Sequence, residues 1–285
     1  MKLVTFEAQG CERIGVVVEG DRVVDLSETS LPSTMIGLIA AWDGIAHDVQ
    51  RFVANTKPQH SLADVHLKAP VPRPPKILAI GLNYADHIAE TGREKPANQV
   101  WFAKMSNAVN GPFDRIEIPK VSNDVDYEAE LVFVVGKRCR HVSKEKAHEV
   151  VFGYCAGNDV SVRDWQYASP QWILGKSFDT YAPFGPWIVT ADEIGDPHTL
   201  GIRCLVNGVV RQNSNTRELV FNIFDQIAHL SQAMTLEPGD VIFTGTPGGV
   251  GAAMKPPGYL KAGDTVCVEI DKIGTLIADV RRECD

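Results

Sequence analysis

The stretch Asp126-Tyr127-Glu128-Ala129-Glu130-Leu131-Val132-Phe133-Val134-Val135-Gly136 decides the fold of this chain. Successive side chains of a strand point to opposite sides, so the apolar run from Leu131 to Val135 supplies both faces. A strand that is apolar on both faces lies inside a sheet that is covered on both sides. Glu128 and Glu130 are two residues apart, so they project from one face where this strand begins.

Two neighbouring carboxylates at the end of a buried strand repel each other and lose solvation. One of them must take up a proton, or a cation must lie between them. A divalent cation with oxygen ligands is the simplest solution. The alternative is a solvated strand end beside a loop, and the motif alone leaves that alternative open.

Composition places the chain among ordinary soluble globular proteins, with 44% hydrophobic and 22% charged residues. The formal net charge of −8 argues against a nucleic-acid partner, because a phosphate-binding surface needs clustered Lys and Arg. The first residues lack the apolar core of a signal peptide, and no apolar run is long enough to span a membrane. Six scattered cysteines without a C-x-x-C pair argue against zinc or iron–sulfur sites. We therefore expect a cytoplasmic protein with free thiols.

The proline-rich segment 69–75 divides the chain. Short strands over residues 2–6, 13–18 and 22–26, and a helix over about 34–54 with Ser33 as its cap, precede it. Its four prolines favour an extended, stiff connector. We predict a small N-terminal α+β domain over residues 1–70 and a larger domain over residues 71–285.

The larger domain is mostly strands and turns. Asn207-Gly208 is a strong signal for a two-residue hairpin turn. The pattern contains no alternation of strands and helices, so a Rossmann or TIM architecture is disfavoured. We predict an α+β, β-rich fold: a mixed β-roll with peripheral helices. The expected strands are 76–80, 131–135, 187–190, 202–206, 241–244 and 265–270, and the expected helices are about 144–151 and 221–234.

His87 and Glu90 follow directly after the buried strand 76–80. If this segment is helical, the two side chains lie three residues apart on one face. A carboxylate beside an imidazole raises its basicity, which suits a general base. The alternative is an ordinary His–Glu contact on an exposed helix, and spacing alone favours that alternative.

A third acid, Asp159, follows the glycine turn at Gly157. Arg163 and Gln166 come four and seven residues later, so all three would share one face of a helix. An arginine and an amide on that face would suit an organic carboxylate. The alternative is an ordinary helix start with Asp159 or Ser161 as its cap.

Two lysines and a glycine-rich loop carry weaker signals. Lys176 lies in an apolar and aromatic region, where a lysine can neutralise an oxyanion, or it is a surface lysine. Lys104 follows a hydrophobic run. The loop Gly245–Gly251, which contains Thr246, would let the backbone approach a ligand, although it lacks the context of a nucleotide fingerprint.

Taken in order, these motifs resemble the fumarylacetoacetate hydrolase family, over about residues 74–277. The closest resemblance is to its small two-domain members, the fumarylacetoacetate hydrolase domain-containing proteins. The departures are Met105 and Gly248, where relatives often have proline. The matching motifs are G-x-N-Y-x-D-H-x-x-E (81–90), F-x-K (102–104), D-x-E-x-E-L (126–131), N-D-V-S-x-R-D-x-Q (158–166), G-K-S-F-D-T (175–180) and G-T-P-x-G-V-G (245–251), followed by K-P-P (255–257).

The resemblance implies roles for the matching residues. It implies a β-roll fold, usually dimeric, with Mg²⁺, or Mn²⁺ or Ca²⁺ in its place, bound by three carboxylates. His87 and Glu90 would form a water-activating dyad on a lid, and Lys176 would stabilise the oxyanion. The implied metal ligands are Glu128, Glu130 and Asp159, and the implied substrate contacts are Lys104, Arg163, Gln166, Thr246 and Tyr84.

These roles imply a metal-dependent hydrolase that cleaves a C–C bond in an acylpyruvate-type or 2,4-diketo acid through a metal-stabilised enolate. The same site would serve an oxaloacetate decarboxylase, a keto–enol tautomerase or a 2-hydroxy-diene-dioate isomerase. A non-catalytic, metal-stabilised binding protein is a more distant alternative. We expect a small 2-oxo acid as substrate, a homodimer, and no nucleic-acid or membrane partner.

Overall fold

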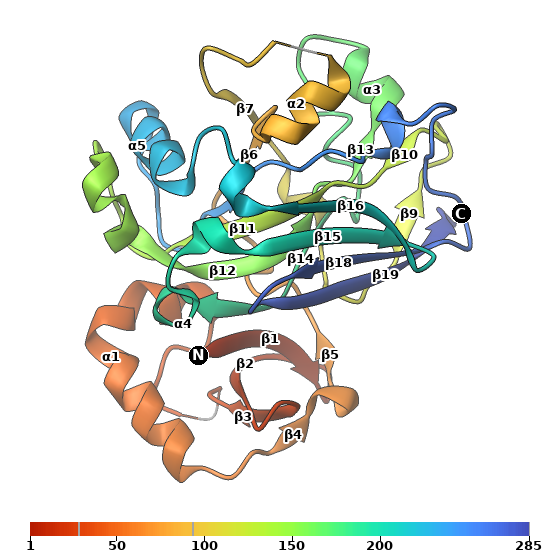
Figure 1. The fold of residues 1–285 in the computed structure, drawn as a ribbon. Coiled ribbons are helices and arrows are strands. Elements are labelled where there is room, and N and C mark those ends of the chain that lie inside the picture. The colour runs from red at the N-terminus through yellow and green to blue at the C-terminus, as the bar shows by residue number, and fades with distance from the viewer. Residues whose placement is uncertain (28, 93, 285) are drawn as a thin grey trace.

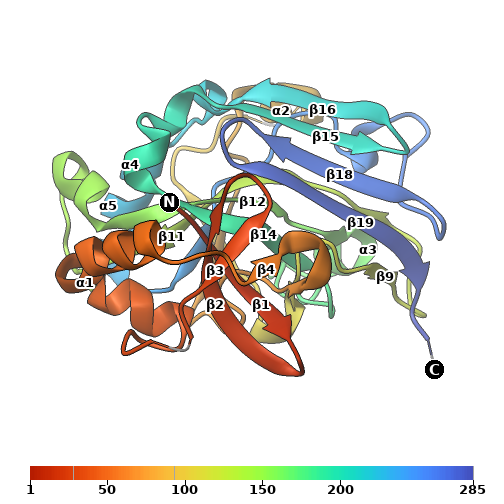
Figure 2. The same cartoon turned by 90° about the horizontal axis from the view of Figure 1, so that it is seen from below.

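Two β-sheets packed face to face form the body of the protein (Figures 1 and 2). The computed structural model describes residues 1–27, 29–92 and 94–284. In the part described, the larger sheet has twelve strands, in the order β4-β3-β2-β1-β14-β12-β11-β17-β6-β7 with β5 and β8 at its sides. A five-stranded sheet, β16-β15-β18-β19-β9, covers its central strands β11, β12 and β14. This architecture confirms the predicted β-rich α+β fold.

The strand β11 (Ala129–Val135) lies at the centre of the larger sheet, and all of its residues are buried. It pairs antiparallel with β12 (Val151–Asn158) on one side and with β17 (Val241–Phe243) on the other. The double-sided burial predicted from the apolar run is therefore confirmed. Burial of this kind is the dominant favourable contribution to folding.

The N-terminal strands continue the larger sheet. β1 (Lys2–Ala8) pairs antiparallel with β14 (Ala182–Thr190), and the Thr5 hydroxyl donates to the Pro70 carbonyl over 2.6 Å. Residues 69–71 of the proline-rich segment are buried against this region. The domain boundary at residue 70 stays a prediction, because the hydrogen bonding of the sheet runs across it.

Most helices and turns lie where the sequence predicts them. The helix α1 (Met35–Asn55) begins one residue later than expected: Thr34 caps it, accepting from the Gly37 amide, and Ser33 does not. The segment Lys144–Val150 is a 3₁₀ helix, η3, and α5 (Ile223–Ala233) packs against it. Asn207 and Gly208 form the expected hairpin turn with positive φ.

The remaining elements complete the two sheets, a separate two-stranded sheet of β10 and β13, and the helices around them (Figure 1). No helix in the described ranges is both long and apolar enough to cross a membrane. Their bounds are β2 (Cys11–Val18), β3 (Arg22–Asp25), β4 (His60–Ser61), η1 (Leu62–Asp64), β5 (His66–Leu67), β6 (Ile77–Gly81), α2 (Ala85–Thr91), β7 (Val100–Ala103), η2 (Ser106–Ala108), β8 (Val109–Asn110), β9 (Ile116–Ile118), β10 (Val125–Asp126), β13 (Ser161–Val162), α3 (Arg163–Tyr167), α4 (Ala191–Ile194), η4 (Pro197–Thr199), β15 (Gly201–Val206), β16 (Val209–Asn215), η5 (Thr216–Glu218), η6 (Gly251–Ala253), β18 (Thr265–Ile270) and β19 (Gly274–Arg282).

The directions of the strands bring four chain segments together at one end of the central strands of the larger sheet. β6 runs parallel to β17, and both β17 and β12 run antiparallel to β11. The ends of β6, β12 and β17 therefore meet the beginning of β11. Loops that follow the ends of strands are a common location for functional residues. The side chains singled out from the sequence lie at this end of the sheet.

Candidate active site

Three buried carboxylates meet where β11 begins. One oxygen each from Glu128, Glu130 and Asp159 lies within 4.8 Å of the others. Glu130 lies at the start of β11, and Glu128 immediately precedes that strand. Asp159 follows the end of β12, and its amide donates to the Glu128 carbonyl over 2.9 Å. An all-oxygen donor set of this charge suits a hard divalent cation such as Mg²⁺, Mn²⁺ or Ca²⁺.

Two buried lysines neutralise part of this negative charge. The Lys176 ammonium lies 2.7 Å from Glu128 Oε2 and 2.7 Å from Asp159 Oδ2. Lys104 forms an ion pair with the other oxygen of Asp159 and donates to the Val160 carbonyl over 3.1 Å. Buried charges are stable only when they are paired in this way.

The electrostatics of the three acids differ. Burial disfavours the charged form of Glu128, but the cations Lys176 and Arg163 outweigh this effect and lower its pKa to about 2. Burial, together with the negative charges of Asp159 and Glu128, raises the pKa of Glu130 well above its usual range. Glu130 is thus a buried acid beside two carboxylates, and a bound cation would remove its electrostatic penalty. The residues present therefore fit a divalent metal ion.

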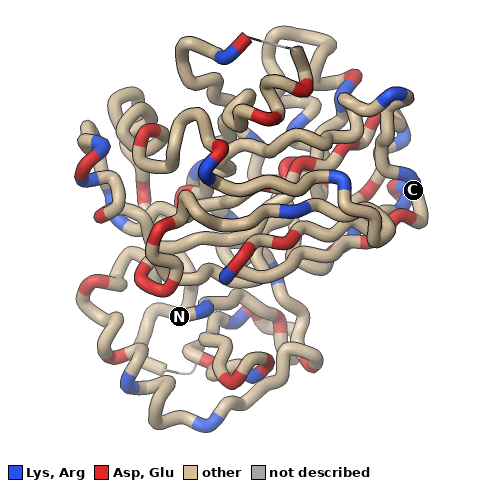
Figure 3. The backbone as a smooth tube through the Cα atoms, in the orientation of Figure 1, with Lys and Arg blue, Asp and Glu red and all other residues tan. Residues whose placement is uncertain are grey.

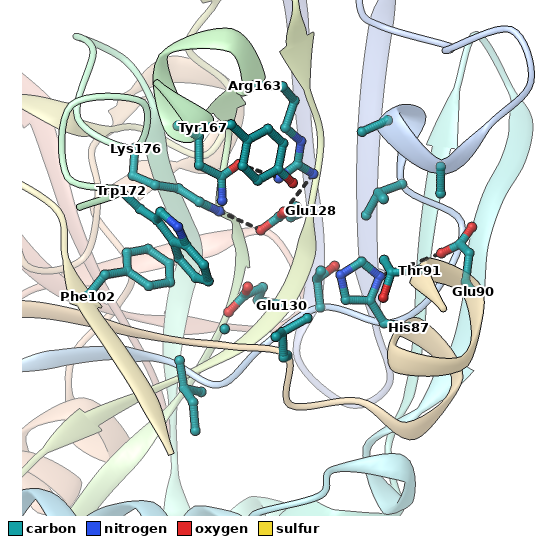
Figure 4. A pocket seen from close by; sticks show the side chains of 18 of the residues that line it. His87, Glu90, Thr91, Phe102, Glu128, Glu130, Arg163, Tyr167, Trp172 and Lys176 are labelled. Atoms are coloured by element: carbon teal, nitrogen blue, oxygen red, sulfur yellow. Dashed lines mark hydrogen bonds and ion pairs between the residues drawn. The ribbon is translucent and has the colours of Figure 1, made fainter. Parts of the chain in front are cut away.

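Arg163 links the acids to the far side of the site. Its guanidinium lies 2.7 Å from Glu128 Oε1 and 2.8 Å from Asp126 Oδ2, and its Nη1 donates to Gln166 Oε1 over 2.8 Å. Glu128 is therefore held between Lys176 and Arg163 (Figure 4). The expectation that Asp159, Arg163 and Gln166 share one helix face is wrong, because α3 begins only at Arg163 and Asp159 precedes the two-residue strand β13.

Asp126 holds Arg163 and the loop after the glycine-rich segment together. Its Oδ1 accepts from the Gly251 amide over 2.7 Å, and its Oδ2 accepts from the Ala252 amide over 2.9 Å and from Arg163 Nε over 2.9 Å. The carboxylate is fully buried, so each of these bonds is shielded from water. Sequence reasoning assigned Asp126 no role, although it opens the motif that contains Glu128 and Glu130.

We expect Asp126→Asn to lower the free energy of unfolding by about 3–5 kcal/mol, the usual cost of breaking a buried ion pair. Arg163 would lose its charged partner, and one of the accepting oxygens would become a donor. Urea unfolding measures the change. Asp21→Asn is the matched control, because Asp21 is exposed in the turn between β2 and β3, and its substitution should cost about 0.5 kcal/mol or less. Equal losses in both variants would contradict the proposed role of Asp126.

The helix α2 carries the predicted dyad and rests on the glycine-rich loop. His87 Nδ1 lies 3.5 Å from Glu90 Oε2, and the same oxygen accepts from the Gly249 amide over 2.8 Å. Asp86 on this helix accepts from the Ser214 hydroxyl over 2.6 Å. The predicted spacing is confirmed as a contact. His87 is 9% exposed, so the surface alternative does not describe it.

The glycine-rich segment reaches the acids through its backbone. The Gly245 amide donates to Glu130 Oε2 over 2.7 Å, and Gly245 has a φ of +103°, a conformation that other residues rarely adopt. The Thr246 hydroxyl donates to the Ala129 carbonyl over 2.9 Å. The close backbone approach expected from the glycines is therefore directed at an acid of the site.

A cavity of about 480 Å³ opens beside the acids. Lys176, Trp172 and Phe102 lie on one side of it and His87 on the other, with Glu128 and Glu130 between them (Figure 4). Eight of the predicted site residues line this cavity: His87, Glu90, Glu128, Glu130, Arg163, Gln166, Lys176 and Thr246.

Three predicted residues lie behind the cavity wall. Asp159 is fully buried with an oxygen in the acid cluster, and Lys104 is behind Asp159. Tyr84 is fully buried, and burial together with the charge of Glu130 raises the pKa of its phenol well above the usual range. The structure thus brings all three near the acids, and the substrate contacts expected of Lys104 and Tyr84 stay predictions.

Sequence reasoning missed part of the cavity wall. Tyr167, Trp172, Lys255 and Tyr259 line it from segments without a periodic pattern. Lys255 belongs to the K-P-P motif, which was a usable signal, but nothing local to the other three indicated a cavity. Thr91, at the end of α2, also lines the cavity, whereas the neighbouring Arg93 lies outside the described residues.

Comparison with known proteins gives consistent matches over nearly the whole chain. Residues 76–281 match the family model described as fumarylacetoacetate (FAA) hydrolase, C-terminal. The chain is 43% identical over 286 aligned positions to the mitochondrial oxaloacetate tautomerase Fahd2a of Rattus norvegicus, covering 98% of this chain and 91% of that protein. The expected cytoplasmic location stays a prediction.

Two solved structures have the same fold. A putative HpcE protein from Mycobacterium smegmatis superposes with a TM-score of 0.89 at 36% identity, and the match covers 100% of both chains. Maleylpyruvate hydrolase from Sphingobium sp. SYK-6, in complex with manganese(II) and pyruvate, superposes with a TM-score of 0.84 at 36% identity, again over 100% of both chains. The expected homodimer is not tested by these similarities.

Proposed function

Because the chain belongs to the fumarylacetoacetate hydrolase family, we propose that it is a metal-dependent keto–enol tautomerase of a 2-oxo acid, with oxaloacetate as the first candidate substrate. The observation that carries the proposal is the buried acid Glu130 beside Glu128 and Asp159, which has no ion-pair partner among the described residues and so calls for a divalent cation. The similarity to a named oxaloacetate tautomerase over almost the full length supports tautomerisation over the hydrolysis expected from the sequence.

A divalent cation on the three carboxylates would supply a Lewis acid for the carboxylate and the 2-oxo group of the substrate. The protein groups then have separate tasks. Lys176 and Arg163 flank Glu128 and supply positive charge where the oxygen of an enol becomes negative. His87, oriented by Glu90, faces the cavity and can carry a proton between the oxygen and C3 of the substrate.

Cleavage of an acylpyruvate by water is the second candidate function. The pairing of His87 with Glu90 fits it, because such a pair can also activate a water molecule. The maleylpyruvate hydrolase that shares the fold supports this candidate as well. Proton transfer at carbon uses the same base, so the dyad alone does not separate the two reactions.

Activity on a panel of substrates distinguishes the tautomerase from the hydrolase. We expect metal-stripped protein to regain activity with Mg²⁺ or Mn²⁺ and to interconvert enol and keto oxaloacetate faster than it cleaves any acylpyruvate. The absorbance of the enol reports tautomerisation, and incorporation of labelled oxygen from water into the products reports hydrolysis. Cleavage of an acylpyruvate with no effect on oxaloacetate would overturn the proposed function in favour of the hydrolase.

We expect His87→Gln to lower kcat about 10²–10⁴-fold, the usual contribution of a positioned acid–base group. The amide keeps a polar side chain of similar size but cannot carry the proton. His229→Gln is the matched control, because His229 is an exposed residue on α5. Steady-state kinetics with saturating Mg²⁺ measures both variants. Wild-type kcat in His87→Gln would show that another group transfers the proton.

A further inference from the structure

Lys255 differs from the other cations of the cavity wall. Arg163 is paired with Asp126 and Glu128, and Lys176 is paired with Glu128 and Asp159. Lys255 lines the same cavity, and it has no ion-pair or hydrogen-bond partner among the residues that the structure describes. Lys255 is therefore the lysine of the cavity wall whose positive charge is not neutralised by a described acid.

The charge of the inner cluster shows why a second cation matters. Four carboxylates (Asp126, Glu128, Glu130 and Asp159) face three cations (Lys104, Lys176 and Arg163). With a divalent cation bound, this cluster carries one surplus positive charge, which one substrate carboxylate balances. A second carboxylate would find no further counter-charge there. The protein as a whole repels it, because the net charge is −8.

The backbone around Lys255 is held in place. The Met254 and Gly258 amides both donate to the Gly251 carbonyl, over 3.2 Å and 2.9 Å, and the Leu260 amide donates to the Val125 carbonyl over 2.8 Å. Asp126 binds the start of this segment through Gly251. Lys255 thus has neighbours held by backbone hydrogen bonds and an exposed side chain, which suits contact with a charged group of a ligand.

We propose that Lys255 binds the second carboxylate of a dicarboxylic 2-oxo acid and so makes the site selective for dicarboxylates over monocarboxylates. The inference rests on the proposed function, since the first carboxylate and the 2-oxo group must occupy the metal site. Lys255 is then a specificity residue and takes no part in proton transfer. The rest of its segment offers the apolar wall residues Val250, Ala252 and Ala253 and the phenol of Tyr259, none of which can replace the positive charge of Lys255.

Binding of two stable compounds tests the inference. 2-Oxoglutarate and 2-oxopentanoate have the same chain length and the same metal-chelating end, and only the former has a distal carboxylate. Calorimetry with the Mn²⁺-loaded protein gives both dissociation constants without requiring turnover. We expect K255Q to weaken 2-oxoglutarate about 10- to 100-fold, as for loss of a charge-assisted hydrogen bond, and 2-oxopentanoate less than about twofold. K255R should stay close to wild type.

Lys261→Gln is the matched control, because Lys261 is an exposed lysine of the same segment that does not line the cavity. We expect it to bind both compounds as the wild type does. Equal losses for both compounds in K255Q, or equal binding of both by the wild type, would overturn the inference and leave the proposed function intact. Failure of the Mn²⁺-loaded wild type to bind either compound would overturn this inference, whereas the proposed function is overturned separately, by the outcome of the substrate panel.

Discussion

Replacement of Lys176 by methionine is expected to lower kcat about 10²–10³-fold while the protein still binds its metal ion. The ammonium lies 2.7 Å from both Glu128 and Asp159 and lines the cavity, so it supplies positive charge beside the reacting oxygen. Loss of one such stabilising group typically costs this factor in rate. Methionine keeps an unbranched side chain of similar length but removes the ammonium, which also lies over the Phe102 ring, 4.9 Å from its centroid.

Metal binding should be retained or strengthened in Lys176→Met. The lysine competes with a cation for two of the three proposed ligands, and its removal leaves both carboxylates free for the metal. Kinetics at saturating Mn²⁺ and calorimetric titration of Mn²⁺ separate the two effects. Loss of metal affinity would mean that Lys176 organises the acids, and unchanged kcat would mean that it does not act on the substrate.

Lys104→Met is the informative companion. Lys104 also pairs with Asp159, but it lies behind the cavity wall. If it only positions Asp159, its loss should destabilise the protein and reduce kcat less than the loss of Lys176. A decrease in kcat as large as that of Lys176→Met, with unchanged stability, would support the substrate contact predicted from the sequence.

Replacement of Glu130 by glutamine is expected to weaken binding of Mg²⁺ or Mn²⁺ more than about 100-fold and to remove turnover at ordinary metal concentrations. Loss of a residue that only supports a metal ligand already lowers metal affinity about 10–100-fold. Glu130 is itself a proposed ligand, so the loss should be larger. The Gly245 amide donates a hydrogen bond to Glu130 Oε2 over 2.7 Å, and a glutamine oxygen can still accept it. The local backbone should therefore keep its conformation. Titration of the metal-stripped protein measures the affinity.

The metal-free protein should tolerate this substitution. Burial and the charges of Asp159 and Glu128 raise the pKa of Glu130 well above its usual range, so the ionised side chain is costly without a cation. We expect metal-free Glu130→Gln to be at least as stable to urea as the metal-free wild type, and Mg²⁺ to stabilise only the wild type. Stabilisation of both proteins by Mg²⁺ would show that Glu130 is not a ligand. Glu269→Gln, at a surface ion pair with Arg203, is the control.

The fold was predictable where it depends on local pattern. The apolar run Leu131–Val135 identified the central strand, and the period of the segment after Thr34 identified α1. Boundaries were less accurate, as the cap of α1 and the 3₁₀ character of η3 show, because the competing local conformations differ little in energy. The side-by-side projection of Glu128 and Glu130 follows from the period of a strand alone.

Much of the candidate site depended on tertiary structure. Asp159 reaches Glu128 because β12 pairs antiparallel with β11 in a fixed register, and it does so without the helix that the spacing suggested. Gly245 reaches Glu130 because β17 pairs on the other side. A single sequence contains the residues but not the register of distant strands, since many pairings satisfy the same apolar pattern.

The sequence by itself therefore determined a buried strand that begins with two acids, and the ordered motifs that identify the family. Only the tertiary structure decided that Asp126 joins Arg163 to the loop at Gly251 and that Lys104 lies behind Asp159. It also decided that Lys255 lines the cavity with no partner in the described part of the chain. The physical reason is the distance along the chain over which each effect acts. Periodicity and turn chemistry act over a few residues, whereas ion pairing and cavity walls depend on where distant segments end.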